Sequence, residues 1–77
     1  MEDLLEYLAK GLVDRPDTVE VESFEEDDGT IVLELHVADD EVGKVIGRNG
    51  RTVNALRTVI RASAVKHGRR VLVDVVD

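Results

Sequence analysis

The sequence contains no cysteine, and its only aromatic residues are Tyr7 and Phe24. The lack of cysteine excludes a disulfide-stapled scaffold and thiolate metal sites, and it is compatible with a reducing compartment. Because 43% of the residues are apolar but only 3% are aromatic, the core must be built from aliphatic side chains. The composition is that of an ordinary globular protein rather than of a disordered chain.

Targeting segments are also missing from the sequence. The first residues have neither the basic nor the apolar segment of a secretory signal peptide, and no apolar run reaches the length needed to span a bilayer. We therefore expect a cytoplasmic location without membrane contact. The 77 residues correspond to one small domain with little stability to spare, so a dimer would not be surprising.

Charge is unevenly distributed along the chain. The net charge is −7, which by itself argues against a nucleic-acid ligand, since domains that bind nucleic acids are usually basic. Residues 1–42 hold fifteen acidic and two basic residues, whereas residues 43–77 hold eight basic and two acidic ones. The chain thus has an acidic half and a basic half, and we expect these charges to be separated in space as well.

The acidic half predicts one helix and a hairpin. Apolar residues at helical spacing indicate an amphipathic helix over Glu2–Val13, which ends ahead of Pro16. We interpret this helix as a lid over a sheet rather than as a partner surface. Alternating apolar and polar residues predict strands over Thr18–Glu22 and Thr30–Val37, joined by a turn at Asp28-Gly29.

Two features of this hairpin could suggest a metal site. The acids from Glu25 to Asp28 lack the alternating ligand spacing of a calcium loop, so a solvated hairpin tip is favoured. His36 has no second histidine or cysteine at metal spacing, so we interpret it as a solvent-side strand residue. We therefore expect no metal. Phe24 breaks the alternation before the turn, which predicts a bulge there.

The basic half begins with a short helix. Asp39 or Asp40 is its candidate N-cap, with Glu41 in its first turn. The helix then runs through residues 42–46. It contains Gly43, which is explained equally well by tight packing against a neighbouring helix and by the close approach of a ligand.

Next comes the stretch Val45-Ile46-Gly47-Arg48-Asn49-Gly50-Arg51-Thr52-Val53. Gly47 and Gly50 can adopt positive φ and carry no Cβ, so a turn here can present bare backbone to a ligand. A longer amphipathic helix over Arg51–His67 follows at once, so free N–H groups and the positive end of the helix dipole gather at the same place. This arrangement predicts an anion site, with phosphate as the obvious anion.

The order of elements predicts an α+β fold. A final apolar strand over residues 71–76 follows the longer helix. The connection between the second strand and this last one is a crossover of about thirty residues, so the two strands can pair in parallel. We expect an α-β-β-α-α-β chain with a three-stranded mixed sheet and three helices on one face.

The stretch around Gly47 and Gly50 resembles the Ile-Gly-x-x-Gly core of KH domains, and the element order resembles the type II arrangement. The chain is identified as a member of the small bacterial KH-domain RNA-binding proteins of the KhpA family. The resemblance covers residues 1–77 as a single KH domain with its Gly-x-x-Gly loop at 47–50. It implies a non-catalytic protein that clamps about four nucleotides of single-stranded RNA in a groove beside this loop.

The same resemblance implies partners and site residues. It implies a homodimer or a heterodimer with a larger KH-containing protein, and a role as an RNA chaperone or post-transcriptional regulator. The residues that it assigns to RNA binding are Lys44, Val45, Ile46, Gly47, Arg48, Asn49, Gly50, Arg51, Asn54 and Arg57.

The residues also allow other functions to be weighed. An enzyme is disfavoured because there is no cysteine, and because neither Ser23 nor Ser63 has an adjacent base; no cofactor is expected. Two aromatic residues do not supply the stacking platforms of other RNA-binding modules. The remaining alternative is a protein-interaction module whose acidic half docks a partner and whose glycine loop is only structural.

Overall fold

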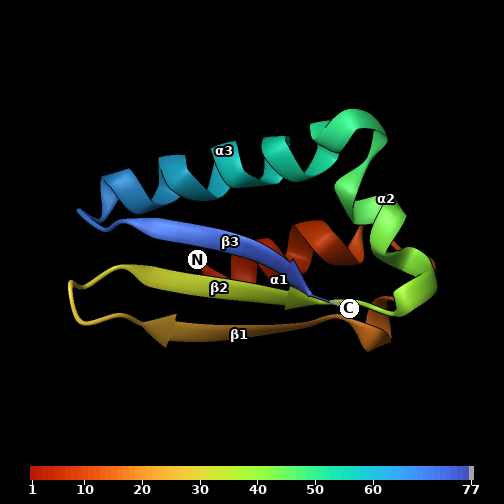
Figure 1. Cartoon of the computed structure of the whole chain (residues 1–77), viewed down its shortest axis with the longest axis horizontal. Helices are drawn as coiled ribbons and strands as arrows, with labels where there is room; N and C mark the ends of the chain where they lie inside the picture. The colour runs from red at the N-terminus through yellow and green to blue at the C-terminus, as the bar shows by residue number, and fades with distance from the viewer. Residues whose placement is uncertain (77) are drawn as a thin grey trace.

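The computed structural model describes residues 1–76 and shows one sheet with helices packed against it (Figure 1). The helices and strands in chain order are α1 (Glu2–Lys10), β1 (Glu20–Glu25), β2 (Ile31–His36), α2 (Val42–Ile46), α3 (Arg51–Lys66) and β3 (Val71–Val76). Short 3₁₀ turns lie at Pro16–Thr18, Asp39–Glu41 and Arg48–Gly50. The predicted α-β-β-α-α-β order and the α+β fold class are confirmed.

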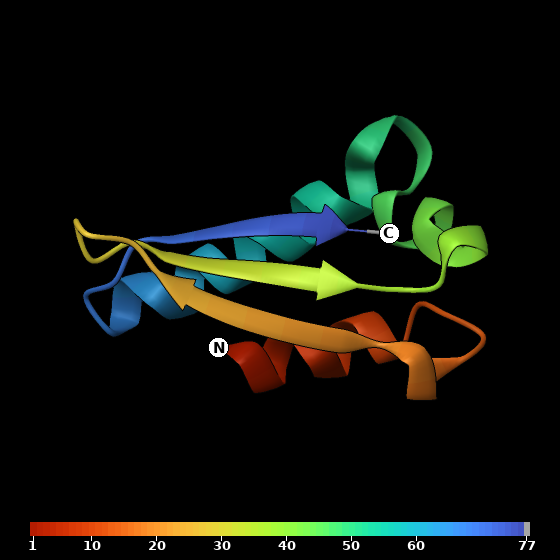
Figure 2. The same ribbon diagram turned by 60° about the horizontal axis from the view of Figure 1, so that its bottom comes forward.

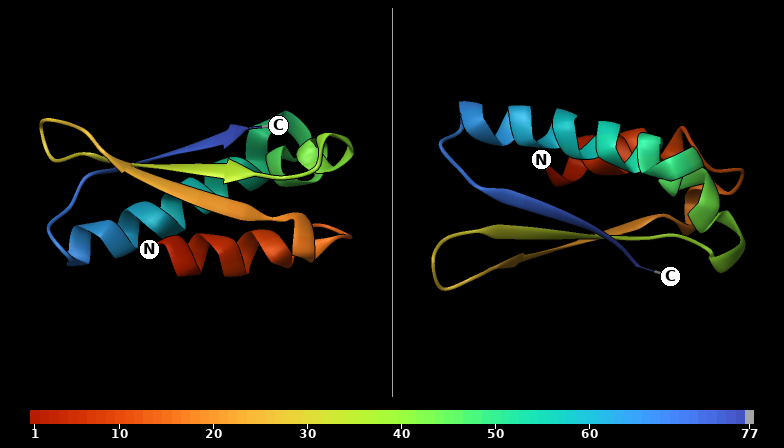
Figure 3. Two further views of the ribbon diagram at one scale, coloured as in Figure 1. Left: turned by 90° about the horizontal axis from the view of Figure 1, so that it is seen from below. Right: turned by 45° about the horizontal axis from the view of Figure 1, so that its top comes forward.

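The sheet has the order β1-β2-β3. β1 pairs with β2 in antiparallel fashion, and β2 pairs with β3 in parallel, as the crossover connection predicts. All the helices lie on the same side of this mixed sheet, in a second layer (Figure 3). The other side of the sheet carries no helix and faces forward in Figure 2; we call it the uncovered face.

The core lies between these two layers and is aliphatic. Its fully buried side chains include Leu5 of α1, Leu33 and Leu35 of β2, and Ile60 of α3. Burial of each such side chain contributes about 1.5–3 kcal/mol, so these contacts hold the helices to the sheet. Within residues 1–76, none of the helices combines the length and the apolar character that crossing a bilayer requires.

Three local predictions in the acidic half are wrong. The first strand begins at Glu20 and not at Thr18, which lies in a 3₁₀ turn, and it continues to Glu25 instead of ending at Glu22. α1 ends at Lys10, ahead of Gly11, because glycine is a poor helix former. Phe24 forms no bulge, since the pairing of β1 with β2 is continuous from Glu20 to Glu25. Phe24 simply occupies the uncovered face, where it is 47% exposed, so the break in the pattern reflects an exposed aromatic residue rather than an inserted one.

The predicted N-cap of α2 is also wrong. Asp39 and Asp40 lie in a 3₁₀ turn, and no side chain caps α2. The acid that stabilises this region is instead Glu41, whose side chain is buried, at 2% exposed. Its carboxylate accepts hydrogen bonds from the backbone N–H groups of Asp14 and Arg15 and, at 3.1 Å, from Arg15 Nε. Glu41 thus fastens the segment after α1 to the start of α2.

The surroundings of Glu41 act on its pKa in opposite directions. Burial alone would raise the pKa of this carboxyl group. The N–H groups of Asp14 and Arg15, the Arg15 guanidinium and the Lys44 ammonium outweigh burial and hold the pKa below its ordinary value of 4.5. The network therefore contributes stability above pH 4.5, and this contribution is lost as the pH falls through the lowered pKa of the folded state.

We predict that Glu41→Gln lowers stability at neutral pH, because the amide places an NH₂ group against backbone N–H donors. Urea unfolding of the variant and of wild type should differ most at pH 7, and the difference should shrink below pH 4.5. Glu26→Gln at the exposed hairpin tip serves as the control and should leave the pH profile unchanged. A constant difference from pH 7 to pH 3 would contradict the assignment of this pH dependence to Glu41.

Candidate nucleic-acid interface

The turn between α2 and α3 depends on three residues with positive φ. Gly47 has φ 76° and ψ 173°, Asn49 has φ 57°, and Gly50 has φ 75° and ψ 13°. Asn49 and Gly50 lie in the left-handed helical region, which asparagine and glycine adopt most readily. Gly47 lies in a region that is essentially restricted to glycine. The sequence predicted this conformational demand at both glycines.

Gly47 is required for a second reason, which involves Thr52. A Cβ atom at position 47 would lie 2.2 Å from Thr52 Oγ1 and 2.9 Å from the Thr52 backbone nitrogen. The start of α3 therefore packs directly on the bare backbone of Gly47. A Cβ at Gly50 would have room, with Asn54 Nδ2 at 3.7 Å as its nearest contact. The packing role of Thr52 was not visible in the sequence pattern.

The N-terminus of α3 is free to receive an anion. α3 is 16 residues long, its first turn contains no acidic residue, and no side chain caps it. Arg48 and Arg51 are both exposed at this end, and neither forms an ion pair with another residue of the described chain. Unpaired cations and the positive end of the helix dipole thus coincide at one surface.

Lys44 differs from these two arginines because it is already paired. Its ammonium group forms an ion pair with Asp14 and lies 3.6 Å from Glu41 Oε2. The hydrogen bond to the Asp14 carboxylate is the main cause that raises the pKa of Lys44. Asp14 is thirty residues away in sequence, so no sequence pattern could reveal this contact. A phosphate would have to compete with Asp14 for the Lys44 charge.

The other predicted site residues divide into buried and accessible ones. Val45 is fully buried in the core, so it holds α2 in place, while Ile46 is half-buried. Asn54 and Arg57 lie on the side of α3 that faces the β3 edge, where Arg57 Nε donates to the Val73 carbonyl at 3.1 Å and Arg57 Nη1 donates to Asn54 Oδ1 at 3.4 Å. Asn54 and Arg57 thus lie beside the glycine turn, and we call this part of the surface the flank of the loop.

Gly43 lies on the exposed surface of α2. A Cβ at this position would meet nothing within 4 Å, so the interpretation of Gly43 as a packing residue within the chain is wrong. The alternative, close approach of a ligand, stays a prediction.

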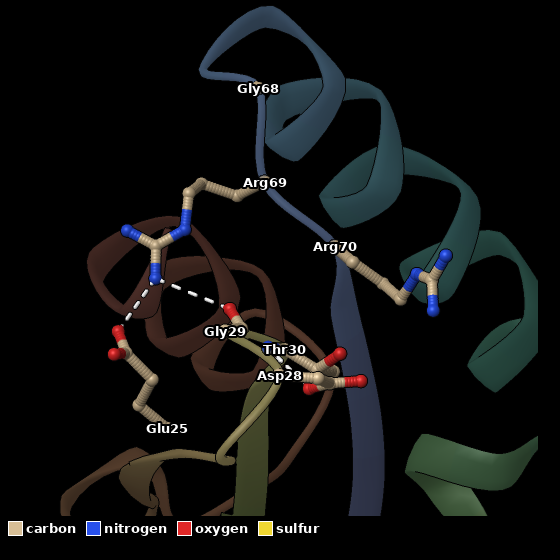
Figure 4. A pocket seen from close by; sticks show the side chains of 7 residues that line it. All are labelled: Glu25, Asp28, Gly29, Thr30, Gly68, Arg69 and Arg70. Atoms are coloured by element: carbon tan, nitrogen blue, oxygen red, sulfur yellow. Dashed lines mark hydrogen bonds and ion pairs between the residues drawn. The ribbon is translucent and has the colours of Figure 1, made fainter.

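The last arginines of the basic half lie away from the loop, beside the hairpin tip. Arg69 pairs with Glu25 at 2.7 Å and donates to the Gly29 carbonyl at 3.4 Å (Figure 4). The hairpin tip and the end of α3 are at one end of the molecule, whereas α2 and the glycine turn are at the other (Figure 1). The expected separation of charge is therefore partial, because part of the basic half neutralises the acidic hairpin.

Comparison with known proteins identifies the family. The family model of the KhpA/KhpB KH domain matches residues 2–75. The chain belongs to this family. The "RNA-binding protein KhpA" of Clostridium acetobutylicum is 50% identical over 99% of this chain and 100% of its own length, and that of Streptomyces coelicolor is 54% identical over 100% of this chain and 92% of its own length. The family is non-catalytic, in agreement with the prediction that the chain is not an enzyme.

A solved structure confirms the fold. The chain superposes on Era, crystallised with MgGDPNP and nucleotides 1506–1542 of 16S ribosomal RNA, with a TM-score of 0.67 and 19% identity. The match covers 96% of this chain and 28% of the Era chain. The fold is thus the type II KH arrangement that the sequence predicted.

We predict that alanine has unequal effects at the two glycines. Gly50→Ala should cost about 1–2 kcal/mol, the penalty for a left-handed residue with a Cβ. Gly47→Ala should cost about 3 kcal/mol, because its φ/ψ region excludes alanine and its Cβ would strike Thr52. Urea unfolding measures both values. Equal costs would contradict the packing of Thr52 on Gly47.

Proposed function

We propose that the protein binds single-stranded RNA without catalysis, with the sugar-phosphate backbone held at the glycine turn. The observation that carries this proposal is the uncapped N-terminus of α3 beside the unpaired Arg48 and Arg51. Backbone N–H groups, the helix dipole and two guanidinium groups all favour phosphate there. The relatives that are named RNA-binding proteins match this chain over nearly its full length, which supports the same ligand.

The proposed path of the RNA follows the flank of the loop. Gly47, Asn49 and Gly50 bring the backbone close to the phosphates, while Arg48 and Arg51 supply charge. The bases lie along α2 and α3, against Ile46 and the exposed backbone at Gly43, and next to Asn54 and Arg57. With no aromatic residue at this site, binding depends on phosphate and aliphatic contacts, so we expect modest affinity, loose sequence preference and a steep salt dependence.

The acidic residues limit this footprint to one end of the molecule. The uncovered face of the sheet carries Glu20, Glu22, Glu34 and Asp74, which repel phosphate. The hairpin tip, whose acids are only partly neutralised by Arg69, lies at the far end from the turn (Figure 1). A bound strand therefore runs over the helices beside the turn and not across the sheet.

We predict that Arg48→Asp/Asn49→Asp abolishes RNA binding without unfolding the protein. Both side chains are exposed, and aspartate tolerates the left-handed conformation of position 49. Fluorescence anisotropy with a short labelled single-stranded RNA, at two salt concentrations, measures the effect. Wild type should bind with a clear salt slope, and the folded variant should bind at least tenfold more weakly.

The matched control is Ala62→Glu/Lys66→Glu, which changes the net charge equally but lies on the exposed surface of α3 away from the turn. This control should bind nearly as well as wild type. If both double variants lose binding equally, only the net charge matters and the turn is not the clamp. If no RNA binds to wild type, the protein-interaction alternative is favoured.

A further prediction concerns Lys44, which already forms an ion pair with Asp14. Asp14→Asn should release Lys44 for phosphate, because the Asp14 carboxylate is its close partner. RNA affinity should rise a few-fold at low salt, and the gain should shrink as salt increases. In a Lys44→Gln background the same substitution should have little effect. An equal gain in both backgrounds would show that Asp14 acts through the general field and not through Lys44.

The proposed biological setting includes a second KH-containing chain, either another copy or a larger protein. An apolar groove between α1 and α3 supports such pairing; it is lined by Leu8, Leu12, Thr52, Ala55, Leu56 and Val59. The family model covers KhpA and KhpB together, which fits a paired arrangement. Two glycine turns in one assembly would raise avidity for a longer RNA, as suits an RNA chaperone or post-transcriptional regulator in the cytoplasm.

A further inference from the structure

The uncovered face of the sheet carries an excess of negative charge. By the register of the strands, the residues that alternate onto this face are Glu20, Glu22, Phe24, Val32, Glu34, His36, Leu72, Asp74 and Val76. Four of them are acids, and none is a lysine or an arginine. His36 is the one residue of this set that can carry a positive charge. The face therefore attracts cations, in contrast to the hairpin tip, where Arg69 pairs with Glu25.

Two of these acids are placed directly opposite each other. Glu22 on β1 pairs with Glu34 on β2, and like charges at such positions destabilise a sheet. His36 lies two residues beyond Glu34 on the same strand, so its side chain points to the same face. The three side chains converge, with ligand atoms that all lie within 4.8 Å of one another. This is the one such cluster among the residues that the structure describes.

The distances match those of a metal centre. His36 Nε2 lies 3.6 Å from Glu22 Oε1 and 3.6 Å from Glu34 Oε1. Two ligand atoms of a tetrahedral zinc ion, each bound at about 2.0–2.1 Å, are separated by about 3.4 Å. Both distances from the imidazole are therefore close to this value, while the two carboxylate oxygens lie within 4.8 Å of each other and would have to approach to bind the same ion. Because the ligands stand on two paired strands, the backbone already fixes their relative positions.

The imidazole of His36 is a second feature that favours a bound cation. The His36 side chain is 30% exposed, but its Nε2 atom is shielded from solvent and has no hydrogen-bond partner within residues 1–76. Both carboxylate oxygens lie at ion-pair distance from it and are too far away for a hydrogen bond. Leaving a buried polar atom unpartnered is unfavourable. A cation between the three groups would use this nitrogen and would also relieve the repulsion between Glu22 and Glu34.

We propose that Glu22, Glu34 and His36 form a binding site for a divalent transition-metal ion of the zinc class. An imidazole with two carboxylates suits Zn²⁺ better than Mg²⁺ or Ca²⁺, which take oxygen ligands. Three protein ligands leave the fourth position of the ion for water or for a ligand from a partner. The bound ion links β1 to β2. The structure places His36 on the uncovered face of β2, as the sequence predicted, and only the register of β1 on β2 brings Glu22 of the other strand beside it.

The test uses the untagged full chain, treated with a chelator and then titrated with Zn²⁺ by isothermal calorimetry. We expect one ion per chain and a higher melting temperature in its presence. Glu34→Gln and His36→Asn should each weaken binding at least tenfold. Glu20→Gln removes the same charge from the same face, and His67→Asn removes the other histidine; both variants should stay within about twofold of wild type.

Nuclear magnetic resonance of wild type provides a reading that does not depend on how the variants fold. Zn²⁺ should shift the ring signals of His36 and leave those of His67 unchanged. Absence of saturable binding would overturn the proposal. Equal losses in Glu20→Gln and Glu34→Gln would also overturn it, because they would indicate diffuse attraction of cations to an acidic face.

Discussion

A single buried carboxylate connects the parts of this small protein that must stay together for the glycine turn to exist. Glu41 receives hydrogen bonds from the segment after α1 and stands immediately before α2. α2 has five residues, which is too short to be stable by itself. Its position therefore depends on Val45 in the core and on Glu41 at its start. Without both anchors, the turn that follows would not be held against Thr52.

In the folded protein, acidic and basic residues are concentrated on different surfaces. Acidic residues occupy the uncovered face of the sheet and the hairpin tip, whereas Arg48 and Arg51 stand at the start of α3. The two halves of the sequence are nevertheless in contact, because Asp14 pairs with Lys44 and Glu25 pairs with Arg69. A chain with a net charge of −7 can thus present the exposed Arg48 and Arg51 to one ligand while its acidic face excludes the same ligand.

Much of this fold could be predicted from the sequence because its signals are local. Alternation in β2, helical spacing in α3 and the two glycines each depend on residues close in sequence, and the crossover length then dictates the parallel pairing. The positive φ of Gly47 follows from the same local reasoning. What could not be predicted rests on contacts between distant segments: the burial of Glu41, the pairing of Lys44, and the meeting of Glu22 with His36, which requires the register of β1 on β2.

The position of β3 at the edge of the sheet has a consequence for solubility. An apolar outer strand exposes backbone groups that could pair with a strand of another molecule, which is a common route to aggregation. Here Arg57 reaches from α3 to the Val73 carbonyl and places a positive charge beside it. A foreign strand would have to displace this guanidinium group to extend the sheet. Arg57, which we assign to the proposed RNA site, therefore also hinders the pairing of β3 with a strand of another molecule.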